Sequence, residues 1–398
     1  MSQSKLCLSI IVKDEERVIR RMLETVWPIL DHYIVVDTGS TDNTKQIVED
    51  FFKEKGIPGK VVDHEWVNFC TARNFARVEA EKTGCSHSFW IDADEQLIID
   101  PAFKKEQFLQ ALDKLSGAAV ETEYGSTRYN RNQIWSNTAG YYWYGPVHEF
   151  LQTDKPLDKP TGFIRGIHTL VTPDGNSWTS MTQQEKYERD SKILLDYVKN
   201  DPKKDPRWVF YLAQSYRDAV TTENAIESVF WYGERIKRGG GYTEELYWAQ
   251  FQIANLKIRI NNELAAAKKP VKYANVEIVD DLLKCSDFDS LRAEHFVILC
   301  KFYERQRRFE SMYILISYAF KNFHKKNPYP KRGLFLDPQT YSWKIADCLN
   351  IAAWYTNRKS ESKKAINQCM AAVHKGLVTN PGEAERIRNN LKFDYNAK

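Results

Sequence analysis

Asp92 and Asp94 are the residues of this 398-residue chain whose spacing points most directly to chemistry. They stand in Asp92-Ala93-Asp94-Glu95, immediately after the apolar run Ser88–Ile91. Two carboxylates two residues apart in a turn can face one hard cation such as Mg²⁺ or Mn²⁺. Such a cation keeps one face for phosphate oxygens, where it neutralises the charge on a leaving diphosphate. The motif therefore predicts a site for a metal ion and a phosphorylated ligand.

A second polar turn follows the apolar run Tyr33–Val36. It begins Asp37-Thr38-Gly39-Ser40-Thr41-Asp42, and its glycine lets the chain turn tightly over a ligand. Asp37 can accept a hydrogen bond from a ring N–H or a ribose hydroxyl. Ser40 or Asp42 is suited to cap the helix that follows. We therefore expect Asp37 to contact a nucleotide.

Two more polar segments stand at comparable places. Lys13-Asp14-Glu15 follows the apolar run Leu6–Val12, and Thr71-Ala72-Arg73-Asn74 opens a later helix pattern. A guanidinium at a helix start can bind a diphosphate through two parallel hydrogen bonds. Lys13, Glu15 and Arg73 therefore join the candidate ligand-binding residues.

The elements that position these residues alternate along the first hundred residues. Strand patterns end near positions 12, 37, 62 and 91, and helix patterns lie between them. This order is typical of a mostly parallel sheet with helices on both faces, where ligands bind beyond the carboxyl ends of the strands. A mixed region follows, with a helix near 101–115 and strands around 118–123, 140–144 and 161–167.

The second half of the chain reads almost entirely as helices. Three helix–turn–helix pairs look alike and are centred on Tyr216–Asp218, Tyr303–Arg305 and Trp354–Thr356. Helix pairs that stack on their neighbours are the mark of a solenoid, although the period here is irregular. We predict two domains, an α/β domain at 1–180 and an α-helical, repeat-like domain at 181–398.

The two halves differ in charge. Residues 1–180 carry a balance of −6 and residues 181–398 a balance of +10. One interpretation is that helical domains are simply rich in solvated Lys and Arg. The other is an anionic partner for 181–398.

The motifs together resemble a known enzyme family. IIVKDEE, VVDTGSTD, TARN and FWIDADE, in this order, are similar to the family 2 glycosyltransferases of the GT-A fold. YGPVHEFL at 144–151 and GIHTL at 166–170 resemble one subgroup, in which tetratricopeptide-like helices follow the catalytic domain. The resemblance covers about residues 6–260. It implies a Rossmann-like GT-A catalytic domain that uses a nucleotide-sugar, UDP-type donor and Mn²⁺ or Mg²⁺.

The resemblance also implies roles for the candidate residues. Asp37 would contact the nucleobase and Glu15 the nucleoside, with Lys13 on the same edge of the sheet. Arg73 would touch the base or the diphosphate. Asp92 would lie near the ribose and the metal, and Asp94 would bind the metal directly. The family usually has Asn where this chain has Asp14, which puts the role of that position in doubt.

The catalytic base and a third metal ligand are less clearly marked. An inverting enzyme of this fold needs a carboxylate that takes the proton from the acceptor hydroxyl. His148-Glu149 supplies the candidate pair, with Glu149 as the base, and the alternative is that Glu149 braces a loop through a salt bridge. His168 either completes the metal shell, hydrogen-bonds the diphosphate or is a satisfied core residue. Nearby aromatics are candidates for a sugar pocket, with some of them in the core: Trp135, Tyr141, Tyr142, Trp143 and Tyr144.

Three functions remain open on the sequence alone. The first is a metal-dependent, inverting glycosyltransferase acting on a hydroxyl of a saccharide or protein. The second keeps this chemistry but uses a modified base of a nucleic acid held by the basic helical domain. The third is a helical-repeat scaffold over an inactive transferase domain. The first five residues contain no apolar leader, no apolar run approaches about 18 residues, and the seven cysteines form no C-x-x-C pair. We therefore expect a cytoplasmic protein with no transmembrane segment.

Overall fold

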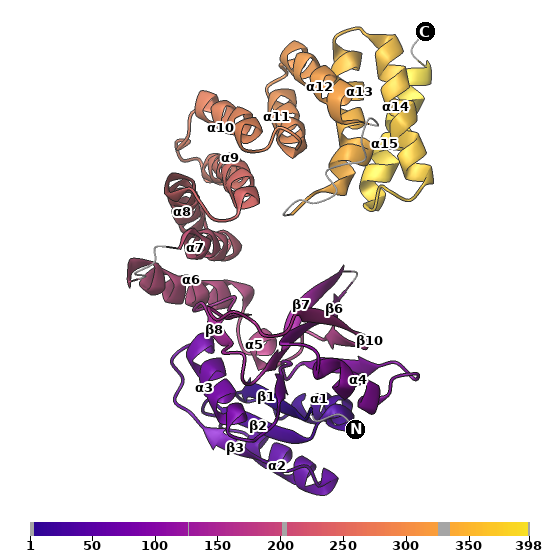
Figure 1. Cartoon of the computed structure of the whole chain (residues 1–398). Helices are drawn as coiled ribbons and strands as arrows, with labels where there is room; N and C mark the ends of the chain where they lie inside the picture. The colour runs from indigo at the N-terminus through magenta and orange to yellow at the C-terminus, as the bar shows by residue number, and fades with distance from the viewer. Residues whose placement is uncertain (1–3, 126, 201–204, 325–334, 397–398) are drawn as a thin grey trace. The chain divides into compact units, whose positions relative to one another are not determined.

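The structure is a computed structural model that describes residues 4–125, 127–200, 205–324 and 335–396. The chain separates into two compact units, residues 1–200 and 201–398. The sequence places a boundary at 180/181, whereas the helix α6 (Gln183–Asn200) belongs to the first unit. The predicted fold class, an α/β domain followed by an all-helical domain, is confirmed (Figure 1).

The first unit is built on an eight-stranded sheet with the order β3-β2-β1-β4-β7-β6-β10-β5. Strands β1 to β4 are mutually parallel where they pair, β6 and β10 are also parallel, and β7 and β5 run against their neighbours. A separate two-stranded sheet pairs β8 with β9. The strands are β1 Leu6–Val12, β2 His32–Asp37, β3 Gly59–Asp63, β4 His87–Phe89, β5 Glu95–Ile99, β6 Gly117–Tyr124, β7 Thr127–Ser136, β8 Tyr142–Tyr144, β9 Phe150–Gln152 and β10 Thr161–Val171.

Alternation along β1 explains how the sheet is covered on both faces. Leu6, Leu8 and Ile10 belong to a core cluster that also holds buried residues of α1, α2 and α4. Cys7 belongs to a second cluster with Ala76 and Ala80 of α3. Because successive side chains of a strand point to opposite faces, both faces bury apolar surface. The helices of this unit are α1 Ile19–Val26, α2 Thr44–Lys55, α3 Phe69–Glu81, α4 Lys105–Leu112, the single turn α5 Asn176–Thr179, and α6.

Three strands, β5, β7 and the short β9, have no counterpart in the sequence prediction. β5 directly follows the Asp92–Asp94 turn, where a polar turn alone was expected, and β7 pairs with β6 in an antiparallel hairpin. β7 reads Thr-Arg-Tyr-Asn-Arg-Asn-Gln, a polar sequence whose alternation of apolar residues is weak. Pairing with β6 and β4 compensates for this weak local pattern.

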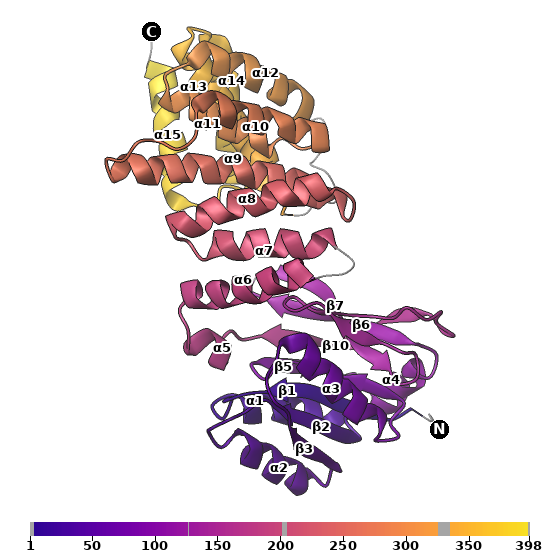
Figure 2. The ribbon, with the colours of Figure 1, turned by 90° about the vertical axis from the view of Figure 1, so that its left-hand side faces the viewer.

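The second unit consists of helices that pack in succession, as Figure 2 shows. The predicted pairs are present as α7/α8, α11/α12 and α13/α14, and α9/α10 adds a fourth. The helices are α7 Pro206–Asp218, α8 Thr222–Arg238, α9 Thr243–Ala266, α10 Asn275–Phe288, α11 Glu294–Arg305, α12 Phe309–Phe323, α13 Ile345–Tyr355 preceded by the π-helical turn η2 Thr340–Lys344, α14 Lys359–His374 and α15 Pro381–Asn396.

The turns of the three predicted pairs each contain one residue in the left-handed conformation. Val220, Arg307 and Asn357 each have a positive φ, at 67°, 58° and 61°, between the two helices of a pair. The residue after each of the last two donates its N–H back into the preceding helix, Arg308 to Tyr303 O and Arg358 to Ala353 O. This is the left-handed helix ending that usually employs glycine. The three turns are therefore more alike in backbone conformation than in residue type.

A buried ion pair in the second unit gives a stability prediction. Arg235 and Glu245 are 0% and 6% exposed and lie 2.9 Å apart, from Nε to Oε2. We expect Glu245→Ala to lower the free energy of unfolding by about 3–5 kcal/mol, because it leaves the buried guanidinium without the carboxylate that accepts its Nε–H. Glu234→Ala, which removes a partly exposed pair with Lys237 on the same helix, should cost under about 1 kcal/mol. Urea unfolding followed by circular dichroism compares the two variants, and equal losses would contradict the expectation.

Within the described ranges, none of the helices combines the length and the apolar character that crossing a bilayer requires.

Candidate active site

The carboxyl end of β2 carries one of the predicted residues. Asp37 ends this strand and is 1% exposed. Its Oδ1 accepts hydrogen bonds from the N–H groups of Gly39 and Ser40, both at 2.8 Å. Its Oδ2 is buried and accepts no hydrogen bond from the protein. Since an unsatisfied buried oxygen is costly, this atom is suited to accept a ligand's N–H or O–H.

Asp14 ties the loop after β1 to the loop after β2. Its φ is 53°, in the left-handed region where Asn and Asp are favoured among non-glycine residues. Its Oδ1 accepts the N–H of Thr41 at 2.6 Å, and its own N–H is donated to Ser40 Oγ at 2.9 Å. Asp14 therefore fixes the backbone of both loops. Lys13, beside it, is exposed at the strand end.

The Asp42 carboxylate performs the predicted capping role from one residue before the N-cap. Helix α2 begins at Thr44 with Asn43 as the N-cap, and Asp42 Oδ1 accepts the N–H of Thr44 at 3.0 Å. Ser40 instead binds Asp14, as described above.

The Asp92–Asp94 turn connects β4 to β5. Asp92 is half-exposed, with a side-chain exposure of 39%, and Asp94 is half-buried. Burial and then repulsion by Asp92 raise the pKa of Asp94 to about 6. Burial and then repulsion by Asp94 and Asp92 likewise raise the pKa of Glu15 to about 7, although the N–H of Asn176 opposes this. The turn thus brings several carboxylates close together, and a bound cation would offset the repulsion between them.

Arg73 lies beneath this turn and is 7% exposed. Its Nη2 donates to Asp92 Oδ1 and its Nε to Glu149 Oε1, both at 2.7 Å. Its guanidinium also packs on two indole rings, 4.7 Å from the centroid of Trp90 and 4.9 Å from that of Trp143. Burial alone would lower the pKa of Arg73, but the two carboxylates outweigh it and raise it. Arg73 therefore holds Asp92 and Glu149 to one another, and the expectation that it touches the donor finds no support in this geometry.

Arg131 holds the Glu95 carboxylate as Arg73 holds that of Asp92. Its Nη2 donates to Glu95 Oε2 at 2.7 Å, and its guanidinium lies 4.8 Å from the Trp90 ring centroid. Glu95 Oε2 also accepts the backbone N–H of Asp92 at 3.3 Å. Two guanidinium groups that pack on one indole thus anchor the turn. Sequence reasoning missed Arg131 because it lies on β7, a strand that the pattern did not reveal.

Glu149 and His148 lie on the loop before β9. Glu149 is 11% exposed at its side chain and is held by Arg73, so the bracing contact envisaged for it exists. Because the same guanidinium also binds Asp92, the Glu149 carboxylate lies close to the Asp92–Asp94 turn. His148 is exposed and has a φ of 54°. The structure thus brings Glu149 to the candidate site, and Oε1 is the oxygen engaged by Arg73.

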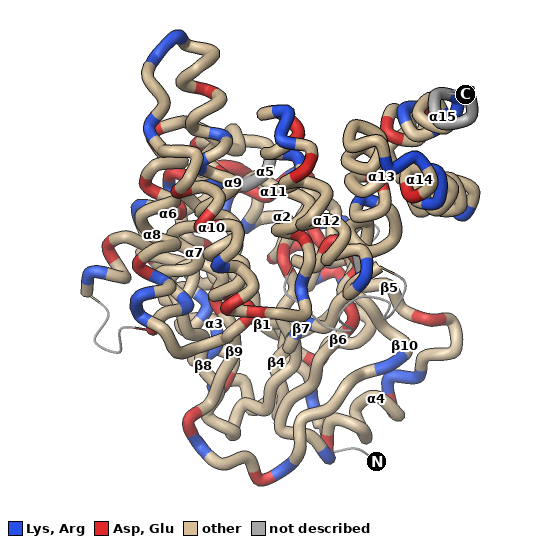
Figure 3. Tube along the Cα trace, turned by 90° about the horizontal axis from the view of Figure 1, so that it is seen from above, with Lys and Arg blue, Asp and Glu red and all other residues tan. Residues whose placement is uncertain are grey.

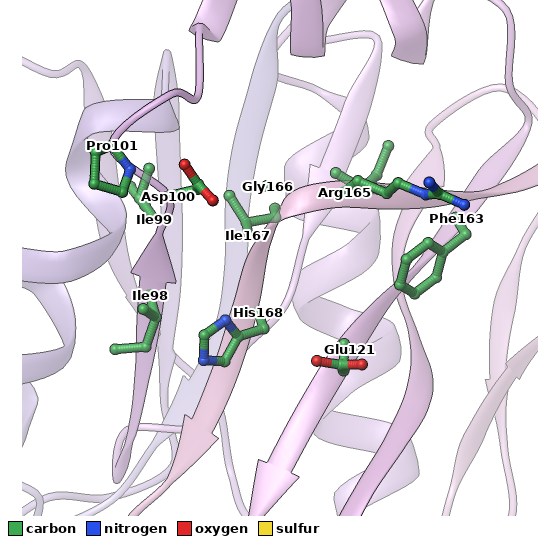
Figure 4. A pocket seen from close by; sticks show the side chains of 11 residues that line it. Ile98, Ile99, Asp100, Pro101, Glu121, Phe163, Arg165, Gly166, Ile167 and His168 are labelled. Atoms are coloured by element: carbon green, nitrogen blue, oxygen red, sulfur yellow. The ribbon is translucent and has the colours of Figure 1, made fainter.

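His168 lies elsewhere on the sheet. In the register it pairs with Ile98 of β5, four residues beyond Asp94 and about 13 Å along the strand at 3.3 Å per residue. Its Nε2 lies 3.9 Å from Glu123 Oε2. It lines a pocket of about 580 Å³ at an irregularity of β10, together with Glu121, Phe163 and Arg165 (Figure 4). His168 is therefore not brought to Asp94, and the metal contact suggested for it has no geometric basis here.

The aromatic cluster is mainly core. Trp135, Tyr141 and Trp143 are 1%, 9% and 3% exposed and pack with Trp90 and Leu151. Tyr142 and Tyr144 are half-exposed. The cluster thus supports Arg73 through Trp143, whose ring packs on the guanidinium.

The donor set fits a divalent cation that shares its coordination with a ligand. Among the described residues, no three His, Cys, Asp or Glu side chains are arranged to hold a metal ion by themselves. Asp92 and Asp94 offer hard carboxylate oxygens, and burial together with the charge of Asp92 raises the pKa of Asp94. Mg²⁺ and Mn²⁺ are commonly bound by one or two carboxylates plus substrate phosphates, so the residues present fit such an ion.

Comparisons with known proteins identify relatives of this chain. Residues 7–168 match the family described as Glycosyl transferase family 2. A TPR repeat-containing protein of Synechococcus elongatus is 33% identical over 299 residues, which cover 71% of this chain and 68% of that protein. The crystal structure of S. aureus TarS 1–349 in complex with UDP-GlcNAc is 14% identical, with a TM-score of 0.38, over 68% of this chain and 94% of that one. The crystal structure of MamA is 12% identical, with a TM-score of 0.35, over 49% and 92%. The family match spans Asp37, Asp92, Asp94 and Glu149.

Proposed function

Because the chain belongs to the family 2 glycosyltransferases, we propose that it transfers a sugar from a UDP-linked donor to an acceptor hydroxyl, with Mn²⁺ or Mg²⁺ at Asp92 and Asp94. The observation that carries the proposal is that Asp37 and the Asp92–Asp94 turn lie at the same edge of the sheet. Asp37, with its unpartnered buried oxygen, ends β2, and the Asp92–Asp94 turn follows β4, two strands away in the order β2-β1-β4. A nucleoside diphosphate can span these two strand ends, base on Asp37 and phosphates toward the turn.

The residues of the chain then have distinct tasks. Asp37 Oδ2 accepts a hydrogen bond from the base, and Lys13 and Glu15 flank the nucleoside at the end of β1. Asp92 and Asp94 would hold the cation, whose positive charge stabilises the departing diphosphate. Glu149 takes the proton from the acceptor hydroxyl as it attacks the anomeric carbon, and the configuration there inverts. The attacking oxygen gains the bond to carbon as the bond to the diphosphate breaks.

A donor screen tests the function directly. We expect UDP release from one or a few UDP-sugars, and we expect Mn²⁺ or Mg²⁺ to be needed for it. The helical-repeat scaffold with an inactive transferase domain predicts no release from any nucleotide sugar under any metal condition. That outcome, obtained with folded protein and a range of candidate acceptors, would overturn the proposal.

The Asp37 contact gives a prediction on affinity. We expect Asp37→Asn to weaken UDP binding by about 1–3 kcal/mol, because the amide keeps an acceptor for the loop N–H groups but turns a donor toward the base. Asp42→Asn alters the same turn without touching Asp37 and should leave the affinity nearly unchanged. Isothermal titration calorimetry with UDP measures both. Equal affinity of wild type and Asp37→Asn would remove Asp37 from the nucleotide site.

The acceptor is proposed as a hydroxyl of a saccharide or a protein. Lys and Arg are interspersed with Asp and Glu along the helices (Figure 3), and several pair with them, among others Lys257 with Asp281 and Arg386 with Asp347. We therefore expect acceptor binding to change little with added salt. A nucleic-acid acceptor held by 181–398 predicts a steep loss of binding between about 50 and 200 mM salt. A fluorescence titration with single-stranded RNA and DNA at these two salt concentrations decides between them.

A further inference from the structure

We propose that the segment Thr172–Asn176, together with Arg21, is a positioning clasp that fixes Asp94 in the geometry needed for metal binding. The inference rests on the proposed function, because it assigns a purpose to residues around a metal ligand. None of these residues touches the reacting atoms. The clasp joins the end of β10 to α1 and to the Asp92–Asp94 turn, which are distant in sequence.

The backbone of Asp94 is held from two sides. Its carbonyl oxygen accepts the N–H of Thr172 at 3.2 Å and Nη2 of Arg21 at 3.5 Å. Arg21 in turn forms a two-pronged ion pair with Asp174, at 2.7 Å from Nη1 and 2.6 Å from Nη2. This hydrogen bonding holds the pKa of Asp174 below its ordinary value. Arg21 is thereby oriented by a residue of the same segment that supplies Thr172.

Gly175 packs closely against the Asp94 side chain. A Cβ at this position would lie 2.9 Å from Cβ and 3.1 Å from Cγ of Asp94, and 3.1 Å from Glu15 Oε2. Its φ is −67°, which any residue adopts, so glycine is needed here for space. The next residue, Asn176, donates its N–H to Glu15 Oε2 at 3.1 Å. The clasp thus limits the position of Asp94 and of the carboxylate beside it.

Two variants test the clasp by metal binding. The probe is Mn²⁺ added to the full chain in the presence of UDP, with free Mn²⁺ measured by electron paramagnetic resonance. We expect Asp174→Asn and Gly175→Ala each to weaken Mn²⁺ binding by about 10- to 100-fold, the range for residues that orient metal ligands. Thermal unfolding should stay close to wild type for Asp174→Asn, because the Arg21–Asp174 pair is about one-third exposed on each side.

Matched controls test whether the loss of Mn²⁺ affinity depends on where each change is made. Gly162→Ala creates equal crowding, 2.8 Å from a Leu115 methyl, but on the opposite end of β10. Glu24→Gln removes an exposed pair with Arg20 on the same helix as Arg21. Both should keep wild-type Mn²⁺ affinity. Wild-type affinity in Asp174→Asn and Gly175→Ala would overturn the clasp and leave the proposed function standing. Failure of the wild type itself to bind Mn²⁺ with UDP would instead refute the metal role in the proposed function.

Discussion

Replacing Asp94 with asparagine should lower sugar transfer by about 10³-fold while the protein stays folded. A metal ion contributes several kcal/mol to stabilising a leaving diphosphate, and about 4 kcal/mol corresponds to a factor of 10³ in rate. The amide keeps the size of the carboxylate and creates no cavity. Initial rates of UDP release at saturating donor, with and without excess chelator, measure the effect.

The same variant should not lose stability. Burial and the charge of Asp92 raise the pKa of Asp94 from 3.8 to about 6. A carboxyl whose pKa is higher in the folded protein than in the unfolded chain destabilises the fold when it is ionised. This cost develops as the pH rises from about 4 to about 6 and is fully present above that range. At pH 7.5 without metal, Asp94→Asn should therefore unfold at the wild-type temperature or above it.

Asp158→Asn is the control for this experiment, because Asp158 is exposed and lies outside the strands of the sheet. It should retain both activity and stability. Near-normal turnover of Asp94→Asn, or a wild-type rate that excess chelator does not change, would exclude Asp94 as a metal ligand. A large drop in unfolding temperature would show that the lost activity reflects a damaged fold.

The sequence predicted the parts of the site that are local. Asp37 and Asp92 each follow a buried apolar run, and the rule that ligands bind at the carboxyl ends of parallel strands brings them to one edge. No such rule exists for contacts between distant segments. Arg21 and Asp174 lie 153 positions apart, and nothing in the residue types near either of them indicates the other.

Arg73 shows a different limit. The sequence identified it as a charged residue at a helix start, whereas α3 begins at Phe69 and Arg73 lies one turn inside the helix. It could not show that Trp90 and Trp143 cover the guanidinium or that Asp92 and Glu149 occupy its donors. Burial depends on how β4, β8 and α3 pack, and this packing is set by the whole unit. His168 is similar, because its place in the register depends on the irregularity of β10.

In the helical unit, the pairs were predictable and their turns were not. Apolar residues at helical spacing predict α7/α8, α11/α12 and α13/α14. Glycine would have marked the left-handed residue of each turn, but Val220, Arg307 and Asn357 stand there instead. Tertiary packing outweighs the local preference at Val220 and Arg307, whereas Asn is a residue type that adopts this conformation readily.

Glu149→Gln should lower the rate of transfer by about 10²- to 10⁴-fold with little change in UDP affinity, if Glu149 is the general base. The amide oxygen can still accept the hydrogen bond from Arg73 Nε, so the link through Arg73 to Asp92 is preserved. Asp92 keeps a counter-charge on Arg73, so the lost function is mainly proton abstraction. The loss should fall on kcat, while the KM for the donor stays close to wild type.

A carboxylate that only braces Arg73 predicts a different pattern for the same variant. The neutral amide weakens the hold on a guanidinium that is 7% exposed, so the unfolding temperature should fall and the KM for the donor should rise, while kcat stays close to wild type. Arg73→Lys provides the comparison, because it loosens Asp92 and Glu149 together and should show this bracing pattern. If Glu149→Gln reproduces Arg73→Lys, or retains full activity, the base must be sought elsewhere in residues 120–180.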